Sequence, residues 1–131
     1  NCGTVTMPHF IIEYSGNLEG EIDMGALCEV IRATAAGIET FPMAGIRVRA
    51  IRVDHYAIAD GNPQHGFIDM SIRLREGRPQ EVKEAAAAEV FGAARAFVAE
   101  VMARRPLALS LEMRDIDASL SPKTGSIRDF L

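Results

Sequence analysis

The chain has 131 residues, of which 48% are hydrophobic and 24% are charged, as is usual for a globular protein of one domain. No stretch of 18 consecutive apolar residues is present, which excludes a membrane-spanning helix of the usual kind. The net charge is −4, the isoelectric point is near 5.4, and no basic patch is interleaved with aromatic residues. We therefore expect neither nucleic acid nor a membrane as a partner.

The first seven residues are interpreted separately from the rest. Residues 1–6 are short and polar, with neither a basic start nor an apolar stretch, so they do not form a secretory signal. Because Met7-Pro8 looks like a natural start, residues 1–7 are expected to be a leader or an expression remnant, with a genuine extension as the alternative. Cys2 lies in this segment and Cys28 lies in a helical pattern, which favours a reducing cytoplasm over a disulfide framework.

Residues 8–131 are predicted to form a single domain, whose first half, about residues 8–61, reads as strand, helix, strand. Residues 9–14 are apolar and β-branched, which is typical of a strand. A helix follows, capped by Asp23 and ended at Gly37. Its apolar positions recur at helical spacing: Leu27, Val30, Ile31 and Thr34. Near alternation of apolar and polar residues then predicts a long strand over 46–59.

The second half, about residues 66–116, repeats this order. Alternation over residues 68–75 predicts a strand, and Pro79 suits the first position of a long helix that Pro106 stops. The apolar stripe predicted for this helix consists of Val82, Ala86, Val90, Ala93, Phe97 and Val101. A last strand places Leu107, Leu109, Leu111 and Met113 on one face, and residues 117–131 form a tail.

The pattern predicts an α/β fold of two layers, in which a duplicated β-α-β unit forms a four-stranded mixed sheet covered on one face by two helices. Right-handed crossovers make the strands within each half parallel. The uncovered face carries apolar and small residues beside its charges: Ile11, Phe67, Ala108 and Ser110. A half-apolar open face commonly packs against other subunits, so we expect an oligomer.

Several kinds of site have no motif in this sequence. It has no Gly-rich phosphate loop, no cysteine pair at metal-binding spacing and no nucleophile elbow. His9, His55 and His65 stand apart, so no metal site is expected. With no cofactor expected, the remaining chemistry is acid–base or nucleophilic work by side chains or by a terminal amine.

Pro8 offers such an amine if Met7 is removed. Its secondary amine would stand at the start of a strand, and an ordinary α-amino group titrates near 7.7–8.0. Desolvation and nearby arginine charges would lower the pKa of this amine towards the working pH and make it a useful base. From these residues alone, Met-Pro at a start usually has no functional meaning, so both interpretations stay open.

Five segments, in their order and spacing, resemble the 5-carboxymethyl-2-hydroxymuconate isomerase family of the tautomerase superfamily. These segments are Pro8-His9-Phe10, Phe41-Pro42 with Gly45-Ile46-Arg47, Ala59-Asp60-Gly61, Gly77-Arg78 and Leu107-Ala108-Leu109-Ser110. The resemblance extends from Pro8 to about Leu131. It implies a duplicated β-α-β fold that assembles as a homotrimer, and a cofactor-free isomerase in the homoprotocatechuate branch of aromatic catabolism.

The resemblance also implies three site residues: Pro8 as the catalytic base, with Arg47 and Arg78 as the arginines that bind the substrate and assist catalysis. The implied substrate is a small anionic enol with several carboxylates, which guanidinium groups bind through paired hydrogen bonds. From the pattern alone, Arg47 is a solvated strand residue and Arg78 a loop charge. His9 is expected to face away from Pro8 and to be at most a neighbour of the site.

Two alternatives to this function stay open. The chain is a tautomerase of a different enol, or it is a non-catalytic trimeric relative whose proline nitrogen is blocked. With Met7 attached, the nitrogen of Pro8 is an amide without a usable lone pair, so the 131-residue chain is expected to be nearly inactive. Residues 54–58 depart from the family pattern, and this departure is expected to affect the pocket wall and the substrate preference.

Overall fold

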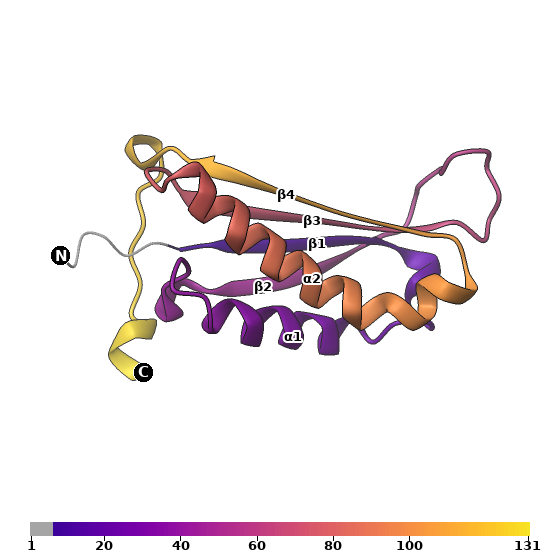
Figure 1. Cartoon of the computed structure of the whole chain (residues 1–131), viewed down its shortest axis with the longest axis horizontal. Coiled ribbons are helices and arrows are strands. Elements are labelled where there is room, and N and C mark those ends of the chain that lie inside the picture. Colours follow the sequence, from indigo (N-terminus) through magenta and orange to yellow (C-terminus); the bar gives the residue numbers. More distant parts are fainter. Residues whose placement is uncertain (1–6) are drawn as a thin grey trace.

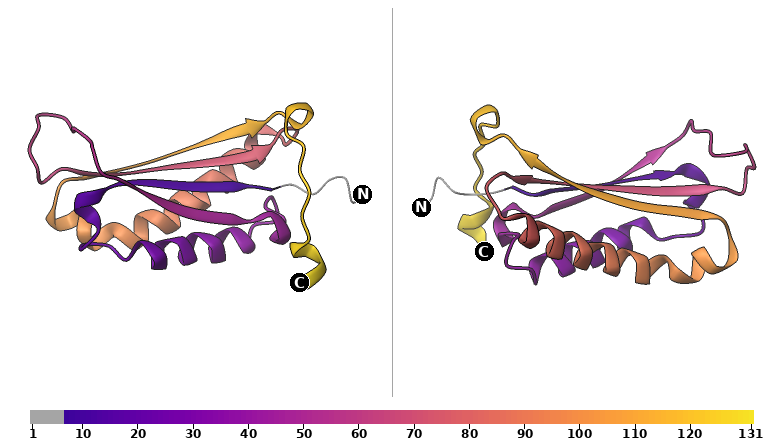
Figure 2. Two further views of the ribbon diagram at one scale, coloured as in Figure 1. Left: turned by 180° about the vertical axis from the view of Figure 1, so that it is seen from behind. Right: turned by 45° about the horizontal axis from the view of Figure 1, so that its top comes forward.

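The computed structural model describes residues 7–131, so the predicted leader lies outside the described residues except for Met7. Two helices lie across one face of a four-stranded sheet (Figures 1 and 2). The elements in chain order are β1 (His9–Ser15), α1 (Met24–Ala36), β2 (Arg47–Val53), β3 (Gly66–Arg75), α2 (Gln80–Arg104) and β4 (Leu107–Ile116). This arrangement confirms the predicted two-layer α/β fold.

The order of the strands in the sheet is β2-β1-β3-β4. Strands β1 and β2 are parallel, β3 and β4 are parallel, and the two halves meet at the antiparallel pair β1–β3. Each half is therefore a parallel β-α-β unit, as predicted. Because of these directions, the start of β1 lies beside the start of β2 and the end of β3, and the end of β4 is at the same end of the sheet.

The core lies between the helices and the sheet. Phe10, Ile12, Ile68, Met70 and Ile72 are fully buried on the helix-facing side of β1 and β3. The Asp23 carboxylate caps α1 by accepting a hydrogen bond of 3.0 Å from the Ala26 N–H group, as predicted. Among residues 7–131, no helix is both long enough and apolar enough to cross a membrane.

The buried stripe of α2 differs from the prediction. Its buried residues are Ala86, Val90, Ala94, Val98 and Val101, whereas Val82 is exposed and the predicted Ala93 and Phe97 are only half-buried. The first four of these buried residues are spaced by four positions. Each step of four residues moves the buried line by about 40° around a helix of 3.6 residues per turn. This drift lets a long helix follow a sheet whose strands twist.

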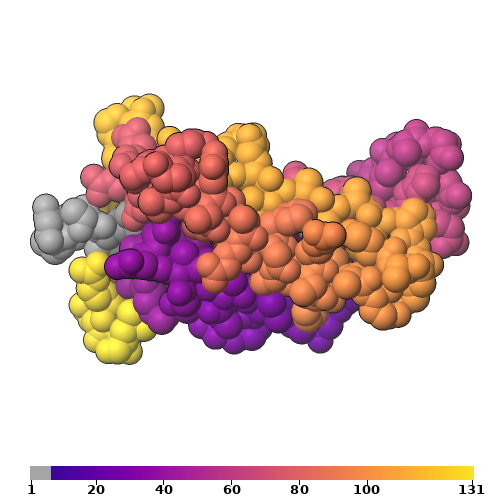
Figure 3. All heavy atoms as spheres, viewed as in Figure 1, coloured from indigo at the N-terminus to yellow at the C-terminus, as the bar shows by residue number. Residues whose placement is uncertain are grey.

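Strand β2 is shorter than predicted, because it ends at Val53 rather than near residue 59. The neighbour of β2 in the sheet is β1, whose last pair joins Ser15 to Val53 before the chain turns into a 3₁₀ helix. Residues 54–65 therefore have no strand to pair with, and they form a loop that projects from the sheet (Figures 1 and 3). The Tyr56 hydroxyl anchors this loop by accepting a 3.2 Å hydrogen bond from the Asn17 N–H group.

The tail after β4 crosses the end of the sheet at which β1 begins (Figure 1). The Glu76 carboxylate holds the start of the tail by accepting a 3.1 Å hydrogen bond from the Ala118 N–H group. A side chain added at Gly125 would place its Cβ atom 3.4 Å from the Cε atom of Met7, so the two segments pass close to each other. Residues 127–130 then contact the short helical turn at residues 43–45.

Candidate active site

Pro8, Arg47 and Arg78 all lie at one end of the sheet. Pro8 immediately precedes β1, Arg47 begins β2, and Arg78 follows the end of β3 in the turn that leads to α2. The backbone N–H of Arg47 points at the carbonyl oxygen of Pro8, 3.4 Å away. Arg78 is distant from the other two in sequence, and the antiparallel pairing of β1 with β3 brings it to this end of the sheet.

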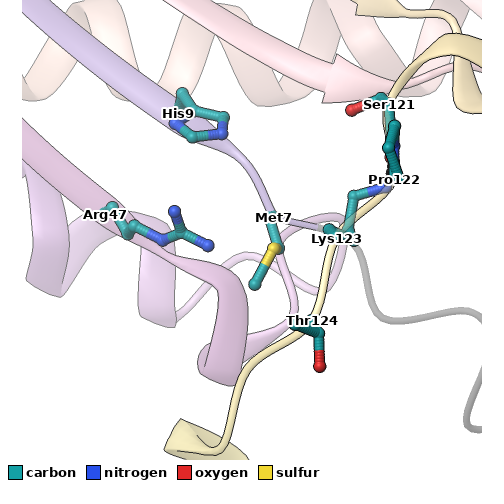
Figure 4. A pocket seen from close by; sticks show the side chains of 7 residues that line it. All are labelled: Met7, His9, Arg47, Ser121, Pro122, Lys123 and Thr124. Atoms are coloured by element: carbon teal, nitrogen blue, oxygen red, sulfur yellow. Dashed lines mark hydrogen bonds between the residues drawn. The ribbon is translucent and has the colours of Figure 1, made fainter.

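A pocket of about 560 Å³ opens at this end (Figure 4). Three segments that are far apart in sequence line it: residues 7 and 9 at the start of β1, Arg47 of β2, and residues 121–124 of the tail. The lining contains the basic side chains of Arg47 and Lys123 and no carboxylate. Such a pocket suits an anionic ligand.

Pro8 is not among the residues that line this pocket. Its side chain is fully buried, while both of its chain neighbours, Met7 and His9, line the pocket. The nitrogen of Pro8 is bonded to the carbonyl carbon of Met7, so it is one bond away from a lining residue. Arg78 is not among the lining residues, and its Nη1 atom donates a 3.2 Å hydrogen bond to the carbonyl oxygen of Arg75.

A row of basic side chains crosses the uncovered face of the sheet beside the pocket. Residues paired in register on neighbouring strands share a face, and the first row consists of Arg47, His9, Arg73 and Arg114. His9 also accepts a hydrogen bond at Nδ1 from the Arg49 Nη1 atom at 3.3 Å. Since a guanidinium group only donates, the proton of a neutral His9 is on Nε2.

The environment of His9 favours its neutral form. Burial lowers the pKa of His9 below its usual value, and the positive charges of Arg73, Arg47, Arg49 and Lys123 lower it further. The start of β1 is thus surrounded by cations from β2, β3 and the tail. This field disfavours additional positive charge and favours bound anions.

A family match covers residues 8–131, and the family is 5-carboxymethyl-2-hydroxymuconate isomerase. The chain belongs to this family. The 5-carboxymethyl-2-hydroxymuconate Delta-isomerase of Escherichia coli is 34% identical over 121 residues, which cover 92% of this chain and 96% of that protein.

Solved structures of the 5-carboxymethyl-2-hydroxymuconate isomerase family agree with this assignment. The crystal structure of a 5-carboxymethyl-2-hydroxymuconate delta-isomerase has a TM-score of 0.90 and 30% identity, and covers 99% of this chain and 96% of its own. The isomerase from Deinococcus radiodurans R1 has the same TM-score and identity, and covers 99% and 98%. The resemblance to this family seen in the sequence is confirmed, and the chain is an isomerase of the family.

Two residues that line the pocket, His9 and Lys123, were not assigned to the site from the sequence. His9 does face away from the buried side chain of Pro8, but the face it occupies is the one on which the pocket opens. Lys123 lies in a tail without periodicity, and it gives no sequence signal of its own. Both residues become visible only when the strand register and the path of the tail are known.

The expectation for residues 54–58 needs correction. These residues line a second pocket of about 470 Å³, together with residues 61–63 and His65. All of these lining residues belong to the loop of residues 54–65, which lies at the opposite end of the sheet from the start of β1 (Figure 1). Within one chain, the departure from the family pattern therefore does not touch the wall of the pocket beside Pro8.

The lowered pKa of His9 predicts a specific dependence of stability on pH. As the pH falls below about 6.5, the unfolded chain protonates its histidine first, so the free energy of unfolding decreases until the pH reaches the folded-state pKa of His9. Above this window both states are neutral and His9 contributes no slope. We expect His9→Gln to lose part of the slope of unfolding free energy against pH in urea titrations between pH 7.5 and 5. An unchanged slope would contradict this assignment.

Proposed function

We propose that the chain ketonises a small, multiply carboxylated dienol such as 5-carboxymethyl-2-hydroxymuconate in the homoprotocatechuate branch of aromatic catabolism, with a freed Pro8 nitrogen as the general base. One observation carries this proposal: the family match begins at Pro8, and the residue attached to the nitrogen of Pro8 lines a pocket that contains cations and no carboxylate. The proposed reaction uses no cofactor.

In the proposed reaction the Pro8 nitrogen accepts the proton of the 2-hydroxyl group. The electron pair of that O–H bond forms the C=O bond of the product, the conjugated double bonds shift, and a carbon atom of the chain takes a proton back from Pro8. No atom or electron is gained or lost overall. The buried position of Pro8 and the cations around β1 support a neutral amine there, because both disfavour its protonated form.

Arg47 is proposed to bind a substrate carboxylate and to stabilise the negative charge that develops on the dienolate oxygen. Its side chain lines the pocket and has no carboxylate partner among residues 7–131. Arg78 is proposed to bind a second carboxylate, in its own chain or in a neighbouring copy, after exchanging its hydrogen bond to the Arg75 carbonyl.

We also propose that the protein is a homotrimer. The sheet face not covered by helices carries Ile51, which is exposed, and the half-buried residues Ile11 and Phe67. Packing this face against other copies would remove these apolar side chains from water.

The arginine roles predict a loss of activity that grows with the number of substrate carboxylates. Arg47→Gln and Arg78→Gln are each expected to lower kcat/KM for 5-carboxymethyl-2-hydroxymuconate by about 10- to 100-fold, since a lost charged hydrogen bond costs about 1.5–3 kcal/mol. The loss should be smaller for the enol of phenylpyruvate, which has one carboxylate. Steady-state kinetics on both substrates measure this, with the exposed Arg95 on α2 replaced by Gln as the control.

Equal losses on both substrates would reject recognition of several carboxylates, and would favour a tautomerase of a different enol. A loss as large in Arg95→Gln would show that net charge, rather than contact with the substrate, is responsible.

A further inference from the structure

We propose that Lys123, held by the C-terminal tail, is a substrate-binding residue that pairs with a carboxylate on the side of the pocket opposite Arg47. This proposal deepens the proposed function and rests on it. No family motif seen in the sequence includes this lysine; its place in the pocket alone indicates the role.

The tail holds Lys123 across the pocket. Residues 121–124 form one wall, and the start of β1 and Arg47 of β2 form the other. In Figure 4, Met7 lies between Arg47 and Lys123. With Met7 in place the pocket still has a volume of about 560 Å³, so a substrate with carboxylates at both ends would span the two cations with its centre near the start of β1.

The segment that carries Lys123 is fixed on both sides. Before it, the Glu76 carboxylate accepts the hydrogen bond of the Ala118 N–H group. After it, residues 127–130 lie close to the turn at residues 43–45. Lys123 therefore occupies the middle of an anchored span, which lowers the entropy lost when a ligand is bound.

The ammonium group of Lys123 is free to bind an anion. It has no carboxylate partner among residues 7–131, and its Nζ atom donates one hydrogen bond of 2.9 Å to the carbonyl oxygen of Ser121. An ammonium group has three N–H donors, so two remain for a ligand. The charge of Lys123 is also one of those that lower the pKa of His9, which indicates that its field reaches β1.

A binding experiment on the full chain tests this role without depending on the Pro8 nitrogen. The probe is propane-1,2,3-tricarboxylate, which cannot be ketonised, and its affinity is measured by titration calorimetry at low salt. Lys123→Gln is expected to raise the Kd about tenfold, and Lys123→Arg, which keeps the charge, to stay within about threefold of the wild type. Arg128→Gln removes one charge from the same tail outside the pocket lining and should leave the Kd unchanged.

The proposal is overturned if the wild type does not bind the probe, if Lys123→Gln binds it as well as the wild type does, or if Arg128→Gln weakens binding to the same extent. The last result would show that the tail contributes only general charge. Each variant is expected to keep the melting temperature of the wild type, since both side chains are exposed.

Two further measurements separate a binding role from a structural one. By NMR, the pKa of His9 should rise in Lys123→Gln and stay the same in Arg128→Gln, because one of the nearby cations is lost only in the former. In the form that begins at Pro8, Lys123→Gln should raise KM about tenfold with little change in kcat. If that form is inactive while the full chain binds the probe through Lys123, the proposed reaction is wrong and the anion site stands.

Discussion

The form of the protein that begins at Pro8 is expected to ketonise its substrate at least about 10²-fold faster than the 131-residue chain. In the longer chain the nitrogen lone pair of Pro8 is delocalised into the peptide bond to Met7 and accepts no proton. A positioned general base contributes about 10²–10⁴-fold to the rate. Both forms are purified, their masses confirmed, and turnover is followed by the loss of dienol absorbance.

Chemical acetylation of the shorter form is the matched control, because it restores an amide at Pro8 without the residues that precede it. Acetylated protein should be as slow as the 131-residue chain. Equal rates in the free and extended forms would remove Pro8 from the mechanism. If neither form turns over any carboxylated enol, the non-catalytic relative is favoured, as it would be if protein from the native host had a mature mass that includes residues 1–6.

Replacing Phe10 by alanine is expected to lower the free energy of unfolding by about 3–5 kcal/mol, the usual cost of removing a buried aromatic side chain. Phe10 is 1% exposed and packs edge-to-face on Phe41, with ring centroids 5.0 Å apart. The cavity left behind would lie under the start of β1, two residues from Pro8. Urea denaturation at a fixed protein concentration measures the change, since assembly would make stability depend on concentration.

Phe130 provides a control of the same residue type, because its side chain is 84% exposed in the tail. Phe130→Ala should change the free energy of unfolding by less than about 0.5 kcal/mol. A Phe10→Ala variant within 1 kcal/mol of the wild type would show that the contact with Phe41 contributes little.

The fold was predictable because its main signals are local. Helix capping by Asp23 and alternation in β3 each act over a few residues, and the structure has both. Pro79 marks the start of α2 but is its N-cap rather than its first helical residue, because the helix begins at Gln80. The length of β2 was not predictable from its own residues, since that strand stops where its neighbour β1 turns away at Ser15. Pairing between strands is non-local, so alternation alone overestimates the length of an edge strand such as β2.

The site was less accessible to sequence reasoning than the fold. Arg47 looks ordinary in the sequence and was named only through the resemblance to the isomerase family, whereas Pro8 was singled out as a possible terminal amine and the resemblance then assigned it the role of base. Their meeting depends on the parallel register of β1 and β2. The part played by Lys123 depends on a tail path that neither periodicity nor composition encodes.

The duplicated architecture limits how many amine sites one chain provides. β3 occupies in the second half the place that β1 occupies in the first, so the fold offers two equivalent strand starts. Cleavage before β1 would expose an amine and keep the sheet whole, whereas cleavage before Gly66 would divide the polypeptide between its halves. A protein of this design can therefore provide one terminal amine for every two β-α-β units, and the corresponding position in the second unit is free to diverge.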